Sequence, residues 1–121
     1  MATATKTART LQTSATNTAA GTKTGTAVDL TGAIGDFLIT AKITNGATGP
    51  TIACSFYVEV SNDNSAWKTY CQLTAGVGNN GIYEFAVLLP APAMYVRSVF
   101  TGNTAQDVTV ESFGHEYTSI G

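Results

Sequence analysis

The residues of this chain that could carry out chemistry are few and lie far apart. The single histidine, His115, stands beside Glu116 in "FGHEY", and a histidine next to a carboxylate could act as a general base. No nucleophile-elbow pattern supplies a serine for this pair to activate. A lone histidine near the end of a strand is usually a polar surface residue. We therefore assign no catalytic residue and expect a protein that is not an enzyme.

Three further motifs contain groups that bind metals or phosphates elsewhere. Cys54 and Cys71 lack the C-x-x-C spacing of zinc sites. Asp63 in "SNDN" supplies half of a calcium loop, but no acidic ligand follows at the required spacing, so the motif favours a tight turn. "AGVGNNG" contains glycines without the lysine and helix of a phosphate-binding loop. We expect no metal and no cofactor.

The elements that would position these residues are short strands. From Ala27 onward, apolar and polar residues alternate with a period of two, and Gly, Asn and Pro separate the runs. This pattern predicts an all-β antiparallel β-sandwich or jelly roll over residues 27–121. Arg97 is expected to pair with an acid on a neighbouring strand. About seven strands are predicted, at residues 26–30, 36–44, 51–60, 66–73, 82–89, 94–101 and 107–113.

The stretch "VEVSNDNSAWKTY" is typical of a hairpin, because alternating runs flank a polar turn. A turn centred between Asn62 and Asp63 places Cys54 opposite Cys71, whereas a turn shifted by one residue makes the cysteines diagonal neighbours. Both registers place the same side chains on the buried face. The predicted core anchors are Cys54, Phe56, Val58, Trp67 and Cys71. Proximity permits a disulfide, although synthesis in a cytoplasm favours free thiols.

Residues 1–26 differ in composition from the rest of the chain. Residues 1–28 contain Lys6, Arg9 and Lys23 and no acid, while the remainder contains three bases and eight acids. Such a Thr/Ala-rich stretch is either a disordered tail or an extended arm that lies on another subunit. Its charge is too sparse for nucleic-acid binding. The candidate interface residues are Lys6, Arg9, Leu11 and Lys23 in the arm, and Tyr57 and Tyr70 on an outward sandwich face.

The low charge of the chain bears on its partners and its compartment. Charged residues make up 12% of the sequence, about half the ~25% of typical soluble domains. Either partners cover much of the surface or neutral polar groups solvate it. The first twenty residues lack the apolar core of a secretion signal, and no later run is long enough for a membrane helix. We therefore expect synthesis in a cytoplasm and no membrane association.

Two motifs support a family resemblance. The pattern V-x-x-S-N-D-x-x-x-W in the hairpin, followed by Y-V-R in "APAMYVRSVFTG", resembles small β-sandwich virion structural proteins of tailed bacteriophages. The resemblance covers about residues 52–113. It implies a virion protein, in its sharpest form a capsid decoration (cement) protein made in the host cytoplasm. The implied partners are the major capsid protein or other virion subunits, together with copies of the chain itself, and a trimer is favoured.

The same motifs are also similar to discoidin-type sugar- or lipid-binding sandwiches, although this chain is shorter and has no secretion signal. The alternative function is therefore a carbohydrate-binding module of a phage tail fibre or adhesin. Tyr57, Tyr70 and Tyr95 would form its aromatic platform. The decoration hypothesis itself predicts that a chain lacking residues 1–25 still folds but no longer binds capsid shells.

Overall fold

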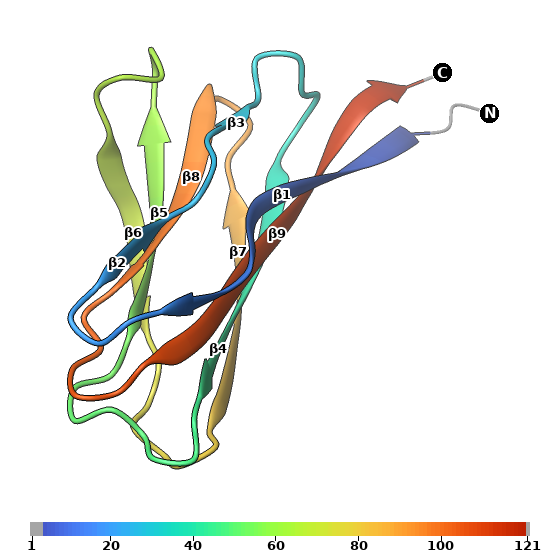
Figure 1. The fold of residues 1–121 in the computed structure, drawn as a ribbon. Helices are drawn as coiled ribbons and strands as arrows, with labels where there is room; N and C mark the ends of the chain where they lie inside the picture. The colour runs from blue at the N-terminus through green and yellow to red at the C-terminus, as the bar shows by residue number, and fades with distance from the viewer. Residues whose placement is uncertain (1–3, 121) are drawn as a thin grey trace.

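The computed structural model describes residues 4–120, with side chains for residues 5–117, and folds them into two packed antiparallel sheets (Figure 1). The predicted antiparallel sandwich is confirmed. All seven expected strands are present, and the N-terminal segment adds two more. The strands are β1 (Ala4–Asn17), β2 (Thr22–Thr24), β3 (Val28–Asp29), β4 (Phe37–Asn45), β5 (Ser55–Ser61), β6 (Lys68–Thr74), β7 (Ile82–Leu89), β8 (Tyr95–Thr101) and β9 (Val108–Ile120).

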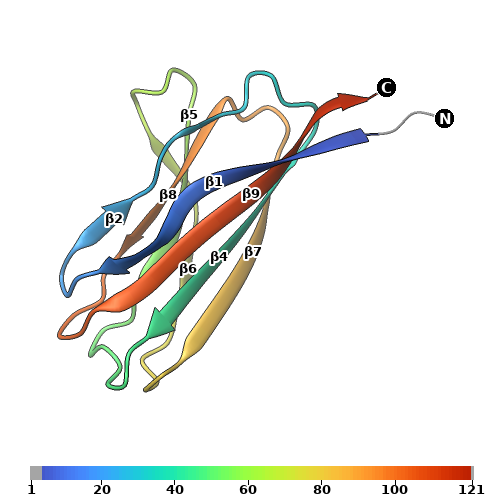
Figure 2. The same ribbon diagram turned by 45° about the vertical axis from the view of Figure 1, so that its right-hand side comes forward.

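The strand order is that of a jelly roll. One sheet has the order β1-β9-β4-β7, and the other has the order β2-β8-β5-β6 with β3 beside β8. The antiparallel pairs are nested, because β1 pairs with β9, β2 with β8, β4 with β7 and β5 with β6. A chain that folds back on itself as one long hairpin and then rolls up gives this order. Figure 2 shows the first sheet from its outer side, with β7 at its free edge.

Alternating side chains fill the space between the sheets. In β4 the inward positions are Phe37, Ile39, Ala41 and Ile43, each 5% exposed or less, as the period-two pattern predicts. Phe56 of β5 stacks between the two layers, with its ring centroid 5.1 Å from that of Phe100 and 6.3 Å from that of Phe85. Burial of each such large apolar side chain contributes about 1.5–3 kcal/mol.

From Ala8 onward, the N-terminal segment is part of this sandwich and not an arm outside it. β1 pairs with β9 along its length, from Ala4 opposite Ile120 to Asn17 opposite Val108. Leu11 is 1% exposed and belongs to the core. The structure thus contradicts the expected boundary between residues 26 and 27. Composition alone suggested that the entropy cost of ordering this segment could not be offset within the chain. Hydrogen bonds to β9 and the burial of Leu11 offset that cost.

Two buried amides join the end of β1 to the loop between β8 and β9. Asn17 Nδ2 donates to Asn103 Oδ1 at 2.6 Å, and Asn103 Nδ2 donates to the carbonyl oxygen of Gln106 at 2.9 Å. Both asparagines are almost completely buried. Because buried amides are costly unless paired, this network fixes the β8–β9 loop against β1.

Gly114 of β9 makes room for an aromatic ring of β4. It lies opposite Ile39 on the inner face, and a Cβ there would lie 2.1 Å from Cζ of Phe37. Any side chain would therefore displace the buried Phe37 ring.

Among residues 4–120 there is no helix long and apolar enough to cross a membrane.

Candidate interaction surfaces

The outer face of the β1-β9-β4-β7 sheet carries large apolar side chains in solvent. Leu38 and Leu88 are directly opposite one another on β4 and β7 and are 44% and 58% exposed. Ile82 at the start of β7 is 61% exposed, and Phe113 of β9 is 36% exposed. We call these four residues and the surface around them the apolar face. Leu38, Leu88 and Phe113 lie on one side of Lys42 and Ile82 lies on the other, so exposed apolar side chains occupy both ends of this face, which makes it a candidate interaction surface.

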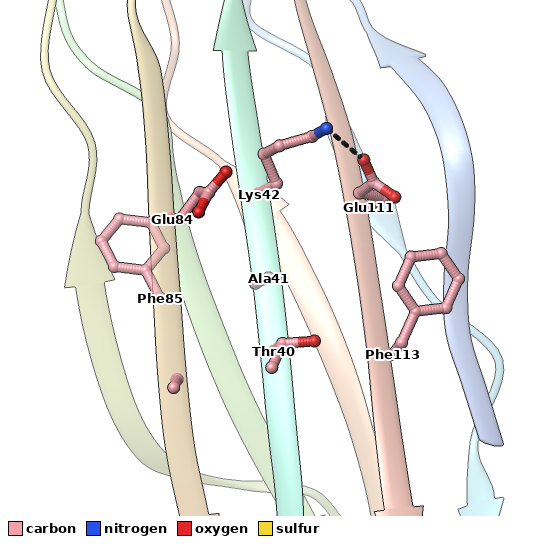
Figure 3. A pocket seen from close by; sticks show the side chains of 8 residues that line it. Thr40, Ala41, Lys42, Glu84, Phe85, Glu111 and Phe113 are labelled. Atoms are coloured by element: carbon pink, nitrogen blue, oxygen red, sulfur yellow. Dashed lines mark ion pairs between the residues drawn. The ribbon is translucent and has the colours of Figure 1, made fainter. Parts of the chain in front are cut away.

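A row of charges crosses the middle of the apolar face. Glu111, Lys42 and Glu84 occupy directly opposed positions on β9, β4 and β7. Lys42 Nζ lies 3.0 Å from Glu111 Oε1, and Glu84 lies on the other side of the lysine (Figure 3). An exposed pair of this kind adds little stability. Beside the row, an open hollow of about 460 Å³ is lined by Thr40, Ala86 and Phe113, among others.

The outer face of the other sheet carries a compact aromatic and charged cluster. Arg97 of β8 lies opposite Glu59 of β5, and Arg97 Nε donates to Glu59 Oε1 at 2.7 Å, so the predicted pairing of Arg97 is confirmed. The guanidinium carbon of Arg97 also lies 4.3 Å from the centroid of the Trp67 ring, in a cation–π contact. Tyr57 follows on the same face, opposite Val99. We call Trp67, Arg97, Glu59 and Tyr57 the aromatic cluster.

The place of Trp67 corrects its predicted role as a core anchor. Val58 pairs with Cys71, but the next residue, Glu59, pairs with Thr69, so Tyr70 is an extra residue in β6. Such a β-bulge moves every residue beyond it to the opposite face of the sheet. Both registers predicted for the hairpin are therefore wrong, and Trp67 packs on the outer surface over Arg97.

The remaining predicted core anchors lie at or near the interior. Cys54, Phe56 and Val58 have no exposed surface, and Cys71 packs against the core while half-buried. The cysteines are free thiols and not register partners, since Cys71 faces Val58. Burial raises the pKa of the Cys54 thiol to about 11 and also raises the pKa of Cys71. Both thiols are therefore protonated at neutral pH.

The carboxylate of Asp63 holds the hairpin turn together. Its Oδ1 accepts hydrogen bonds from the backbone amides of Ala66 and Ser65, each at 2.9 Å, and from the Ser61 hydroxyl, also at 2.9 Å. These bonds, led by those from Ala66 and Ser65, lower the pKa of Asp63. Because these donors occupy Oδ1, the turn interpretation of "SNDN" describes the structure.

The predicted interface residues do not form one surface. Lys6 on β1 is exposed, and Lys23 lies on β2 in the other sheet. Arg9 Nη1 pairs with the buried Glu116 at 2.9 Å. Leu11 is inside the core, so it is not available to a partner and its assignment to an interface is wrong.

The predicted tyrosines are also divided among different places. Tyr57 is half-buried in the aromatic cluster, and Tyr95 lies further along the same face, opposite Ser61. Tyr70, 44% exposed, sits at the bulge and lines a hollow next to Leu89 and Pro90. The three tyrosines therefore do not form the continuous platform that the carbohydrate-binding alternative predicts.

His115 and Glu116 point to opposite faces of β9. His115 is exposed beside Leu38 of the apolar face, whereas Glu116 is 5% exposed and is bonded to Arg9. They therefore cannot work on one substrate atom. Among the described residues, no three His, Cys, Asp or Glu side chains gather where they could hold a metal ion.

Comparison with known proteins finds structures with a similar fold but no family to which the chain belongs. No family model matches the sequence, and no curated protein matches it. The chain is similar to the PBSX exported protein XepA, with a TM-score of 0.60 and 16% identity, over 93% of its own length and 37% of that protein. It therefore spans little more than a third of XepA.

Two further solved structures share the fold. A chain from the disulfide-linked pili of Bacillus endospore appendages has a TM-score of 0.57 and 14% identity, covering 96% of this chain and 90% of that one. A chain of infectious bursal disease virus, Gt strain, has a TM-score of 0.53 and 9% identity, covering 93% and 33%. The same jelly roll thus occurs in a viral protein and in a pilus.

Proposed function

We propose that this chain is a non-enzymatic structural protein of a tailed-bacteriophage particle, and most specifically a capsid decoration protein that binds neighbouring capsid subunits. Its strand order is that of the jelly roll, an architecture common in viral capsid domains. The hairpin motif around Trp67 and the Y-V-R strand resemble those of such virion proteins. The proposed location is the virion, after synthesis in the host cytoplasm.

The observation that carries this proposal is the apolar face. Its four large side chains, Leu38, Ile82, Leu88 and Phe113, stand in solvent on the outer side of a sheet. They expose on the order of 350 Å², so their burial by a partner would contribute roughly 9 kcal/mol before the costs of association. Those costs are of similar size, so one contact is weak and many contacts on a symmetric lattice are strong.

We therefore propose that the contact is made by this face and not by the N-terminal segment. Because β1 pairs with β9 and Leu11 is buried, this segment is not a free arm that could wrap around a neighbouring subunit. The row of Glu84, Lys42 and Glu111 would orient the partner, because charges at an interface act mainly on specificity. The proposed partners remain the major capsid protein or other virion subunits.

Particles purified from cells that encode this chain provide the test. We expect antibody labelling in electron microscopy to place the protein on the outside of the capsid. A Phe113→Asp variant should be lost from the particles, because it puts a charge in the apolar face, while a Gln72→Asp variant on the opposite sheet should be retained. Particles without the wild-type chain, or equal retention of both variants, would contradict the proposal.

A second candidate function is carbohydrate binding by the aromatic cluster. Trp67 and Tyr57 lie on one outer face with the Arg97–Glu59 pair, and jelly rolls also form lectin domains. A glycan array probed with the purified protein tests it. Binding that a Trp67→Ala variant loses would favour this function, and an array without signal would remove it.

A further inference from the structure

β7 differs from the strands at the other edges of the two sheets. Edge strands expose unpaired backbone groups, and natural proteins protect them with bulges, short length or charged side chains. β1 has three register shifts, β2 has three residues including Lys23, and β6 has the Tyr70 bulge and Lys68. β7 has eight residues that pair with β4 without any shift.

The sequence of β7 also favours pairing with another strand. "IYEFAVLL" contains no proline or glycine, and Glu84 is its only charge. Its residues are mostly β-branched, aromatic or aliphatic, as in segments that add to sheets. In the part of the chain that the structure describes, β7 pairs with β4 alone, so its other side is a free edge (Figure 2).

We propose that β7 pairs antiparallel with β7 of a second copy of this chain, about a two-fold axis at Phe85. In an antiparallel pair, directly opposed residues share a face of the sheet. Only every second register therefore places inward residues opposite inward residues and outward residues opposite outward residues. With the axis at Phe85, Ile82 faces the partner's Leu88, and Glu84 faces the partner's Ala86. Two exposed apolar pairs form, one on each side of the axis.

The two neighbouring registers that also keep outward residues opposite outward residues are less favourable. An axis at Glu84 places that carboxylate directly opposite the partner's Glu84, and like charges in this position destabilise a sheet. An axis at Ala86 places Ile82 opposite the partner's Pro90, and proline has no backbone N–H to donate. The charge and apolar pattern of β7 therefore selects a second copy in one register.

The pairing continues the apolar face across both copies. Leu38 and Leu88 are already neighbours across β4 and β7, and the partner's Ile82 would extend this row by one strand. Leu88 and Ile82, 58% and 61% exposed, would each be covered from one side. The Phe85 ring at the axis is on the inner face of β7, where it stacks on Phe56, and the partner's Phe85 would lie on the same face.

The proposed dimer goes beyond the proposed function and does not depend on it. An isologous contact of this kind closes with two copies, whereas the bacteriophage resemblance implies a threefold cluster. The stoichiometry of the purified protein therefore distinguishes the proposed dimer from the trimer that the resemblance implies. Capsid binding is a separate measurement that uses Phe113, two strands away from the β7 edge.

Analytical ultracentrifugation of the full chain, with circular dichroism to verify folding, tests this pairing. At about 100 μM, where a micromolar interface is saturated, we expect a dimer. Ile82→Lys alone and Leu88→Glu alone should each give monomers, because each places an unpaired charge against an apolar side chain. The double variant should recover the dimer, since the new lysine then faces the partner's new glutamate in the proposed register. Phe113→Lys is the matched control and should remain dimeric.

Several results would overturn the proposal. A wild-type monomer at this concentration, or a trimer, contradicts the two-fold pairing. Single variants that are still dimers place the contact elsewhere. A folded double variant that stays monomeric contradicts the register and with it the axis at Phe85.

Discussion

Replacing Leu11 with alanine tests whether β1 is part of the core. The Leu11 side chain is 1% exposed and packs among the central core residues, although it comes from an edge strand. Leu→Ala changes in cores cost about 2–5 kcal/mol, depending on how far the site can collapse. β1 has a register shift between Thr10 and Gln12, next to this position, so the strand can relax and we expect about 3 kcal/mol.

Urea unfolding followed by the fluorescence of Trp67 measures this loss. With a slope of about 1.5 kcal/mol per molar urea, a loss of about 3 kcal/mol lowers the midpoint by about 2 M. Thr10→Ala is the matched control, because Thr10 is exposed on the same strand, and its effect should stay within about 0.5 kcal/mol. Equal midpoints for the Leu11→Ala variant and the wild type would refute the assignment of β1 to the core.

Deletion of residues 1–25 gives a second test of the same feature. The sequence alone predicts a truncated chain that folds, whereas the structure predicts that it does not, because β1, β2 and Leu11 are removed together. The loss would also leave β9 without its partner on one side. A truncated protein with a cooperative transition at the wild-type midpoint would contradict this expectation.

Four other predictions follow from the surroundings of single residues. Gly114→Ala should lower the free energy of unfolding by about 1–3 kcal/mol in urea, because its Cβ would overlap the Phe37 ring. Ala105→Gly should raise the melting temperature through a gain of about 1 kcal/mol, because Ala105 has a φ of 72°. Cys54 should react with a thiol reagent at about pH 8 only after unfolding. Its raised pKa means that its contribution to stability is complete below pH 9.0 and is lost as the pH rises to about 11, and Cys54→Ala should flatten this pH dependence.

The strands were predictable where one face is apolar and the other polar. In β4, every second residue from Phe37 to Ile43 is buried, as alternation requires. β1 could not be found in this way, because Thr and Ala fill both of its faces and Leu11 is its one large apolar residue. Its partner, β9, also lies about a hundred residues away in the chain, where local patterns carry no information.

The two interaction surfaces were predictable to different extents. The outward positions of β7, Ile82 and Leu88, follow directly from the alternation of that strand. The aromatic cluster does not, because it depends on the bulge at Tyr70. An extra residue within a strand cannot be recognised from the hydrophobic pattern. It nevertheless turns the side chains between it and the turn to the opposite face of the sheet. Trp67, which the hydrophobic pattern placed in the core, therefore lies on the surface.

The nested pairing brings the two ends of the described residues together, with Ala4 opposite Ile120 (Figure 1). Residues paired in an antiparallel sheet have Cα atoms about 5 Å apart, so a short linker could join the ends into a circle. New ends could then be opened in the loop at residues 75–81, between β6 and β7. In such a circular permutant, the contact between β1 and β9 becomes local in sequence. Because folding rates rise as contacts become more local, we expect the permutant to fold faster than the natural chain while keeping the same surfaces.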